Sequence, residues 1–369
     1  MTDPAATEPL LATLWRMPAD KDDQVVAARA TLAEVADIAD VSISTVSKVL
    51  NGRPGVSDET RAKIEGLLQQ QGYARRQSST GPAALIDVLV WEIDSTWAVE
   101  LIAGVERVAR EHGLGMVVSG TQDRKSADPR WLDAVLARRP VGVLLVGAEL
   151  PDAPRRVLQS RQVPVVTIDQ GGHAHPSEHS VGSADWSGAF QATRHLIDLG
   201  HRRIGIVTGP DDMIASVARL SGFRAAVEAA GLPLPPEYVR RGEFHHRDGL
   251  EHGGALLELP EPPTAVFASN DLQALGVYEA ARSHGVRIPE QLSVVGYDDL
   301  KAASWVSPAL TTIRVPLAEM ADQATRLLVR LRDEPDFAVS HIDLATTLVV
   351  RQSTAAPAEA AGGPDPVTP

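Results

Sequence analysis

Residues 31–52 read Thr31-Leu-Ala-Glu-Val-Ala-Asp-Ile-Ala-Asp-Val-Ser-Ile-Ser-Thr-Val-Ser-Lys-Val-Leu-Asn-Gly52. This stretch predicts two short helices joined by a tight turn. Thr31 and Glu34 have the spacing of a capping box, in which the hydroxyl covers an early backbone N–H and the glutamate reaches back. Ser42 stands where a hydroxyl can cap the second helix.

A third helix follows, and each of the three helices carries one apolar face. Ser57 is placed to cap the third helix, and Asp58 and Glu59 lie in its first turn, where the helix dipole favours negative charge. We expect the shared core to contain Val35, Ile38, Ala39, Val46, Val49, Leu50, Ile64, Leu67 and Leu68. Residues 31–73 therefore predict a small all-α domain with a helix-turn-helix.

The second helix has an exposed face that suits the major groove of DNA. Ile43, Ser44, Ser47 and Lys48 share this face, where hydroxyls and an ammonium can reach base edges or phosphates. Residues 31–76 hold six basic and six acidic side chains, so charge does not distinguish a DNA-binding domain from a helical bundle without a DNA role. The pattern alone leaves both interpretations open.

The composition of the chain sets limits on its function. The 369 residues are 44% hydrophobic and 22% charged, which is typical of globular domains, and they contain no cysteine. Disulfides, thiolate metal sites and cysteine nucleophiles are thus excluded. The net charge of −13 rules out a uniformly basic nucleic-acid coat. The chain has neither an 18-residue apolar run nor the layout of a signal peptide, so we expect a cytoplasmic protein with no membrane partner.

From about Ala84 onward, strands alternate with helices. Apolar runs predict strands at 85–91, 116–118, 141–146, 165–168, 204–207, 265–268 and 294–296, and glycines 113, 200, 231 and 285 stand where helices should end. Alternation of this kind predicts doubly wound parallel sheets. About 270 residues is long for one sheet, so we expect two subdomains.

These patterns divide the chain into five parts. We expect a flexible N-terminal arm over 1–30, the headpiece over 31–73, a linker or short hinge over 74–83, two α/β subdomains over 84–355 that bind ligand and dimerise, and a flexible tail over 356–369.

The run over 31–52, together with Val56-Ser-Asp-Glu-Thr-Arg61 and Gly72-Tyr73, resembles the headpiece of the LacI/GalR (lactose/galactose repressor) family. The resemblance implies base contacts by Ile43, Ser44 and Lys48. It implies phosphate contacts by Thr31, Ser42, Thr45, Ser47, Asn51 and Thr60.

Two positions depart from the family pattern. Asp40 stands where the family usually has glycine in the turn. The linker is also shorter than usual and lacks the hinge-helix leucine, so Arg75 and Arg76 would bind DNA there by charge more than by intercalation.

The resemblance continues over residues 84–355. Its signatures are His195-Leu-Ile-Asp-Leu-Gly-His-Arg-Arg-Ile204, Arg219-Leu-Ser-Gly-Phe-Arg224, Ala268-Ser-Asn-Asp271, Val294-Val-Gly-Tyr-Asp-Asp299 and Pro308-Ala-Leu-Thr-Thr-Ile313. They imply the type I fold of periplasmic sugar-binding proteins, in which two doubly wound subdomains enclose a ligand cleft.

A sugar needs polar groups for its hydroxyls and an aromatic ring for its CH face. The resemblance assigns hydroxyl binding to Asp169, Arg219, Asn270 and Asp298, and stacking to Trp97 and Phe244. Capping or an internal ion pair stays open for the charged residues. A core or lid role stays open for Trp97, Phe244 and Trp305.

The sequence offers no support for catalysis, a cofactor or a metal. His173, His175, Glu178 and His179 lie in a segment rich in glycine and proline that fixes no ligand geometry, and we expect no metal there. Nucleophile-elbow, phosphate-loop and dinucleotide-binding motifs are missing, so we expect no enzyme.

We therefore expect a sequence-specific DNA-binding regulator. The family resemblance implies a repressor that binds a pseudo-palindromic operator as a homodimer, or as a tetramer, and that a small sugar releases. A corepressor sense stays open, as does the alternative of a sugar-binding protein without a DNA role, in transport or sensing.

Overall fold

The computed structural model describes residues 32–50, 55–70, 83–121, 123–125, 128–169, 178–335 and 337–358. The chain divides into two compact units, residues 1–79 and 80–369. The expected arm over 1–30 and the expected linker, except for its last residue, lie outside the described residues, as do positions 359–369 of the expected tail.

The first unit is a three-helix domain. It contains α1 (Leu32–Ala39), α2 (Ile43–Leu50) and α3 (Asp58–Gln70). Val35, Val46 and Ile64 are fully buried at its centre. Lys63 Nζ donates to the carbonyl of Ala39 at 3.0 Å, so α3 satisfies an unpaired carbonyl at the end of α1.

The core of this unit differs from the prediction at Ile38, whose exposed fraction is 50%. Ala36 is buried in its place. Val35 and Ala39 lie one turn apart on the same face of α1. Ala36, next to Val35, completes this face and packs against α2 and α3, whereas Ile38 lies outside it. The side chain of Leu50 lies outside the described residues.

The turn between α1 and α2 keeps its geometry without glycine. Asp40 has φ 57°, in the left-handed region that glycine adopts freely and that Asp tolerates better than most residues. The Val41 N–H then donates to the carbonyl of Ala36 at 3.0 Å and closes the turn.

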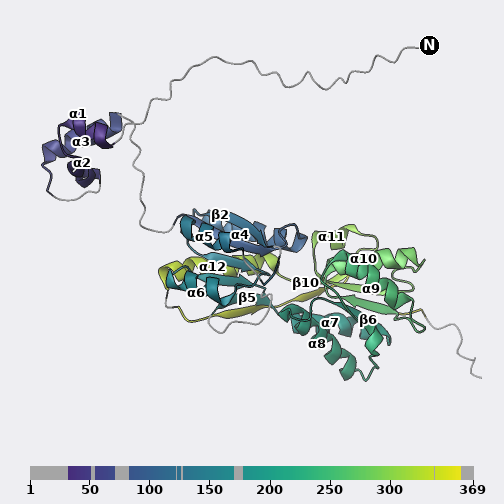
Figure 1. Ribbon diagram of the computed structural model, residues 1–369. Coiled ribbons are helices and arrows are strands. Elements are labelled where there is room, and N and C mark those ends of the chain that lie inside the picture. The colour runs from purple at the N-terminus through teal and green to yellow at the C-terminus, as the bar shows by residue number, and fades with distance from the viewer. Residues whose placement is uncertain are drawn as a thin grey trace, which may run out of the picture. The chain divides into compact units, whose positions relative to one another are not determined.

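The second unit contains two lobes, each built on a six-stranded sheet within the described residues (Figure 1). The sheet of the first lobe has the order β11-β5-β4-β3-β1-β2 and is parallel throughout. Its elements are β1 (Leu85–Trp91), α4 (Thr96–Glu111), β2 (Gly115–Thr121), α5 (Pro129–Arg138), β3 (Val143–Val146), α6 (Asp152–Ser160), β4 (Val165–Ile168), β5 (His179–Ser183), α12 (Leu317–Asp333) and β11 (His341–Leu344).

The sheet of the second lobe has the order β12-β10-β9-β8-β6-β7, in which only β12 is antiparallel to its described neighbour. Its elements are α7 (Asp185–Asp198), β6 (Ile204–Thr208), α8 (Ile214–Ala229), a short 3-10 helix (Pro236–Tyr238), β7 (Val239–Arg241), α9 (His246–Leu257), β8 (Ala265–Ala268), α10 (Asp271–Ser283), β9 (Ser293–Asp298), α11 (Lys301–Trp305), β10 (Thr311–Arg314) and β12 (Thr347–Val349).

The described chain passes between the lobes three times, after β5, after β10 and after β11. Figure 1 shows the consequence, because α12, which is late in sequence, lies with the early helix α4 in the first lobe. Both sheets reverse their winding direction at the first strand of the lobe, β1 or β6. Ligand sites of open α/β sheets form at this point, beyond the carboxyl ends of the strands.

The predicted strands are all present, with boundaries that differ by a few residues, and each of the four predicted helix-ending glycines has a positive φ. The apolar runs did not predict β5, β7, β10, β11 and β12. These strands are short, and β5 and β11 are rich in polar residues and lie beside each other at one edge of the first sheet.

Candidate functional site

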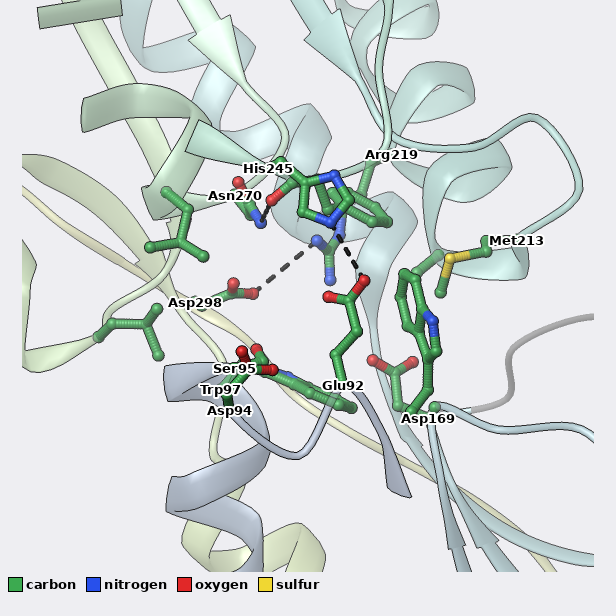
Figure 2. Close-up of a pocket in the computed structure, with 16 residues that line it drawn as sticks. Glu92, Asp94, Ser95, Trp97, Asp169, Met213, Arg219, His245, Asn270 and Asp298 are labelled. Carbon is green, nitrogen blue, oxygen red and sulfur yellow. Dashed lines mark hydrogen bonds and ion pairs between the residues drawn. The ribbon is translucent and has the colours of Figure 1, made fainter. Parts of the chain in front are cut away.

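A cavity of about 220 Å³ lies between the two lobes, at the carboxyl ends of both sheets. Its wall comes from the segments that follow β1, β3 and β4 in the first lobe and β6, β7, β8 and β9 in the second. Figure 2 shows side chains from both lobes pointing toward one another across it. The cavity is smaller than those that hold drug-sized ligands, so it suits a compact molecule.

The structure brings together all six predicted ligand-binding residues on this wall: Trp97, Asp169, Arg219, Phe244, Asn270 and Asp298. Each comes from a different segment of the chain. Their contact with a ligand stays a prediction.

Arg219 is the buried centre of the site. Its Nε donates to Asp185 Oδ1 at 2.8 Å, and its Nη1 donates to the carbonyl of Ser269 at 2.7 Å. Its guanidinium carbon lies 3.9 Å from the ring centroid of Tyr297. Burial lowers the pKa of Arg219, but the neighbouring carboxylates, led by Asp185, more than offset this and raise the pKa overall. The guanidinium is therefore a fixed cation.

Two carboxylates face the cavity near this cation. Asp298 is 5% exposed, and its closest charged partner is Arg219 Nη1 at 3.8 Å. Burial raises the pKa of Asp298 well above its usual range, against the lowering effect of Arg219. Loss of water, and then the charge of Asp185, raise the pKa of Asp169 to about 7. Both side chains are thus poorly compensated acceptors.

The backbone of the site is unusual. Glu92, Asp169, Phe244 and Asp298 all line the cavity, and all four have φ between 51° and 108°. Non-glycine residues rarely adopt this region, and such strain gathers where a fold must aim a side chain. Each of these residues stands at or just beyond the end of a strand, where the chain turns sharply.

Two aromatic rings line the cavity from opposite lobes. Phe244 packs so closely on Gly209 that a Cβ there would lie 2.2 Å from the ring. Trp97 lies in the first turn of α4 and packs on Gly147. Trp305 is 77% exposed and does not line the cavity.

Asn270 also has a structural role. Its Oδ1 accepts from the Gln273 N–H and caps α10, and its Nδ2 donates to the carbonyl of Phe244, both at 2.8 Å. Asn270 thus fixes the loop that carries Phe244 while facing the cavity.

The cavity is also lined by Glu92, Asp94 and His245, which were not predicted from the sequence. His245 Nε2 lies 3.1 Å from Glu92 Oε1, so this pair joins the two lobes (Figure 2). A signal for the two acids was available, because both follow the first predicted strand directly, as Asp169 follows a later one.

Further ion pairs join the lobes beside the cavity. Arg124 Nη2 lies 2.7 Å from Asp212 Oδ1, and Lys125 contacts the other oxygen of the same carboxylate. Lys301 Nζ of α11 lies 2.9 Å from Glu100 Oε1 of α4. Ion pairs between several elements thus join the two lobes in this structure.

The three-helix unit presents the predicted face on α2. Ser42 Oγ accepts from the Thr45 N–H at 3.2 Å and caps the helix, and Ile43, Ser44 and Lys48 are exposed. An isoleucine that is 54% exposed at the start of a helix has no packing role in this unit and suits contact with a base methyl. Thr45, Ser47 and Thr60 are half-buried on the same unit.

Four predicted DNA-binding residues lie outside the described residues: Thr31, Asn51, Arg75 and Arg76. His173 and His175, from the segment where no metal was expected, lie outside them as well. Within the described part of the chain, no three His, Asp or Glu side chains are grouped as a metal site. None of the helices described is both long and apolar enough to cross a membrane.

Two regions of the chain match models of known protein families. Residues 31–76 match the model of bacterial regulatory proteins of the lacI family, and residues 193–354 match that of a periplasmic binding protein-like domain. The ribose operon repressor of Escherichia coli K12 is 34% identical over 329 residues, which cover 88% of this chain and 99% of that repressor.

Two solved structures are similar over nearly the same span. A complex of the transcriptional regulator CelR with cellobiose has a TM-score of 0.67 at 31% identity, covering 88% of this chain and 100% of its own. The lac repressor dimer bound to operator and the anti-inducer ONPF has a TM-score of 0.69 at 26% identity, covering 89% of this chain and 100% of its own.

Proposed function

Because this chain belongs to the LacI family of bacterial regulatory proteins, we propose that it is a transcriptional repressor that a small sugar releases from its operator. The observation that carries the ligand half of this proposal is the meeting of six predicted residues from both lobes in one compact cavity. A ligand there contacts both lobes at once, so its binding energy favours the closed arrangement.

The DNA half rests on α2. Ile43, Ser44 and Lys48 read bases in the major groove, while Ser42, Thr45, Ser47 and Thr60 contact phosphates. Outside the described residues, Thr31, Asn51, Arg75 and Arg76 complete the contacts. One short helix reads few bases, so two protomers, each with one headpiece, bind a pseudo-palindrome. The relatives named above are transcriptional regulators, and a role on the operator places the protein in the cytoplasm.

The domain boundaries follow from the same proposal. Residues 31–73 form the headpiece, 74–83 the linker, and 84–355 the ligand-binding and dimerisation domain, with an arm before them and a tail after them. The linker leads directly into β1, whose carboxyl end carries part of the cavity wall. Closure of the lobes moves the point where the linker enters, and this changes the spacing of two headpieces in a dimer.

The side chains on the cavity wall match the chemical groups of a sugar. Asp169 and Asp298 accept hydrogen bonds from ligand hydroxyls, Arg219 has N–H groups left over to donate to ligand oxygens, and Trp97 and Phe244 stack on the apolar face of the ring.

Two linked measurements test the proposal. Thermal-shift screening of the full chain over monosaccharides and disaccharides should identify ligands, and each hit should then lower affinity for operator DNA selected from genomic fragments. Asp298→Ala should lose the ligand response and keep operator binding. A chain that prefers no DNA sequence, with or without any sugar, would refute the proposal. Sugar binding without any DNA preference would favour a transport or sensing protein.

A further inference from the structure

The wall of the cavity carries more negative than positive charge. Four carboxylates line it, from Glu92, Asp94, Asp169 and Asp298, and its cationic side chains are Arg219 and, when protonated, His245. In a cleft that partly excludes water, an excess of carboxylates without counter-charges is costly.

The cations on the wall are already engaged. Arg219 donates to Asp185, a further carboxylate behind the wall, and to the carbonyl of Ser269. His245 pairs with Glu92 across the lobes. Arg219 Nη1 also lies 3.8 Å from Asp298 Oδ1, so this one guanidinium is shared by Asp185 and Asp298. Asp94 and Asp169 form no ion pair within the described residues, and their charge is therefore left without a paired cation.

Three of the carboxylates lack hydrogen-bond donors. The side chains of Asp94, Asp169 and Asp298 accept no hydrogen bond from any residue that the structure describes. Asp298 is also almost fully buried, with 5% of its surface exposed. Asp94 is exposed at the edge of the cavity, whereas Asp169 is half-buried. Unsatisfied acceptors aimed into a cavity call for a ligand that donates, and their charge calls for a cation.

The remaining surface also suits a cation. The rings of Trp91, Trp97 and Phe244 line the same cavity, and aromatic faces attract an ammonium group. The pKa of Asp169 is raised because loss of water and nearby carboxylates disfavour its charged form.

We propose that this cleft selects a protonated amino monosaccharide over the neutral sugar of the same configuration. The ammonium group of the ligand lies among the free carboxylates and supplies the missing positive charge. The ligand hydroxyls donate to the remaining carboxylate oxygens, and the ring stacks on an aromatic face. A neutral sugar satisfies the acceptors but leaves the excess charge in place. This inference rests on the proposed sugar-binding function.

Calorimetric titration of the full-length protein with matched sugars tests the inference. The probes are glucosamine, galactosamine and mannosamine, each with its neutral parent and its N-acetyl derivative. We expect one amino sugar to bind at least about tenfold tighter than both neutral forms, a difference of about 1.4 kcal/mol. Added salt should reduce this advantage, because the attraction is between charges.

Variants locate the effect. Asp94→Asn should reduce the advantage of the amino sugar and change the affinity of the neutral parent much less. Asp169→Asn also removes an acceptor for ligand hydroxyls, so it should weaken both sugars, and the amino sugar more than its neutral parent. Asp211→Asn is the matched control, because it removes a nearby charge that does not line the cavity. It should leave the advantage intact.

The outcomes separate this inference from the function on which it rests. Neutral sugars that bind as tightly as amino sugars, or more tightly, and that release the operator would overturn the inference and support the proposed function. An amino-sugar advantage that survives both substitutions would also overturn it. If no sugar in the wider screen binds, the proposed ligand class fails together with the inference.

Discussion

Asp212 bridges the two lobes, and replacing it with asparagine should weaken ligand binding. Its carboxylate contacts Arg124 and Lys125 of the first lobe while belonging to the second. The side-chain hydrogen bond from Lys125, together with the charge of Arg124, lowers the pKa of Asp212, so the group is charged at neutral pH. Arg124 is 9% exposed, whereas Asp212 is 48% exposed.

The expected magnitude follows from this exposure. Exposed ion pairs contribute roughly 0.2–1 kcal/mol each, and here two pairs share one carboxylate, with one partner buried. We expect the closed arrangement to lose about 1 kcal/mol, which changes a two-state equilibrium about fivefold. Because the ligand binds the closed state, its dissociation constant should rise by up to about fivefold, with the full factor where the open state predominates without ligand. Operator affinity without ligand should stay the same.

Calorimetry with a sugar identified in the screen measures the change, and Asp211→Asn is the control. Asp211 is the neighbouring residue, carries the same charge and pairs with Arg241 within its own lobe. The effect of Asp212→Asn should shrink at high salt, where exposed ion pairs are screened. Equal weakening by both variants would refute the bridging argument, because local net charge would then explain it. An unchanged dissociation constant in Asp212→Asn would do the same.

Four other expectations concern single residues. Lys48→Ala should weaken operator binding by about 1–3 kcal/mol in fluorescence anisotropy and leave ligand affinity unchanged; equal operator binding would remove Lys48 from the DNA contacts. Arg219→Ala breaks a buried ion pair, so urea unfolding should show a loss of about 3–5 kcal/mol along with the loss of ligand binding, and an unchanged unfolding free energy would contradict the pairing with Asp185. Asp40→Gly should relieve left-handed strain and stabilise the three-helix unit by up to about 1 kcal/mol, seen as slower amide exchange in α1 and α2, whereas Asp40→Asn should have little effect. Burial raises the pKa of Asp271 from 3.8 to about 7 in the folded state, so the folded state binds a proton that the unfolded state has lost. The free energy of unfolding should therefore fall as pH rises from about 4 to 7. Urea unfolding of Asp271→Asn should show a flatter fall, and an identical slope would exclude this residue as the cause.

Local sequence chemistry was enough to place most of the elements. The apolar run of β1 and the periodic face of α4 gave their positions, since a strand or helix depends on residues close in sequence. Helix caps at Ser42 and Ser57 were predicted for the same reason. The prediction was wrong at Ile38, because the direction from which other helices approach α1 is not a local property.

The site was predictable to the level of a sheet edge. Residues that follow parallel strands lie at the carboxyl edge, so Asp169, Asn270 and Asp298 could be placed there from sequence. The family resemblance added Arg219 and the two aromatic residues. The same edge rule applied to the first strand would have added Glu92 and Asp94.

What the sequence by itself determined is the order of domains and elements, the helix face on α2 and the edge of each sheet where polar residues gather. Only the tertiary structure decided how those edges meet. It paired Arg219 with Asp185, joined His245 to Glu92 across the lobes, and left three carboxylates facing a small cavity without donors. The physical reason is that these contacts depend on three crossings of the described chain between two sheets, and a charge is compensated by its neighbours in space, not by those in sequence.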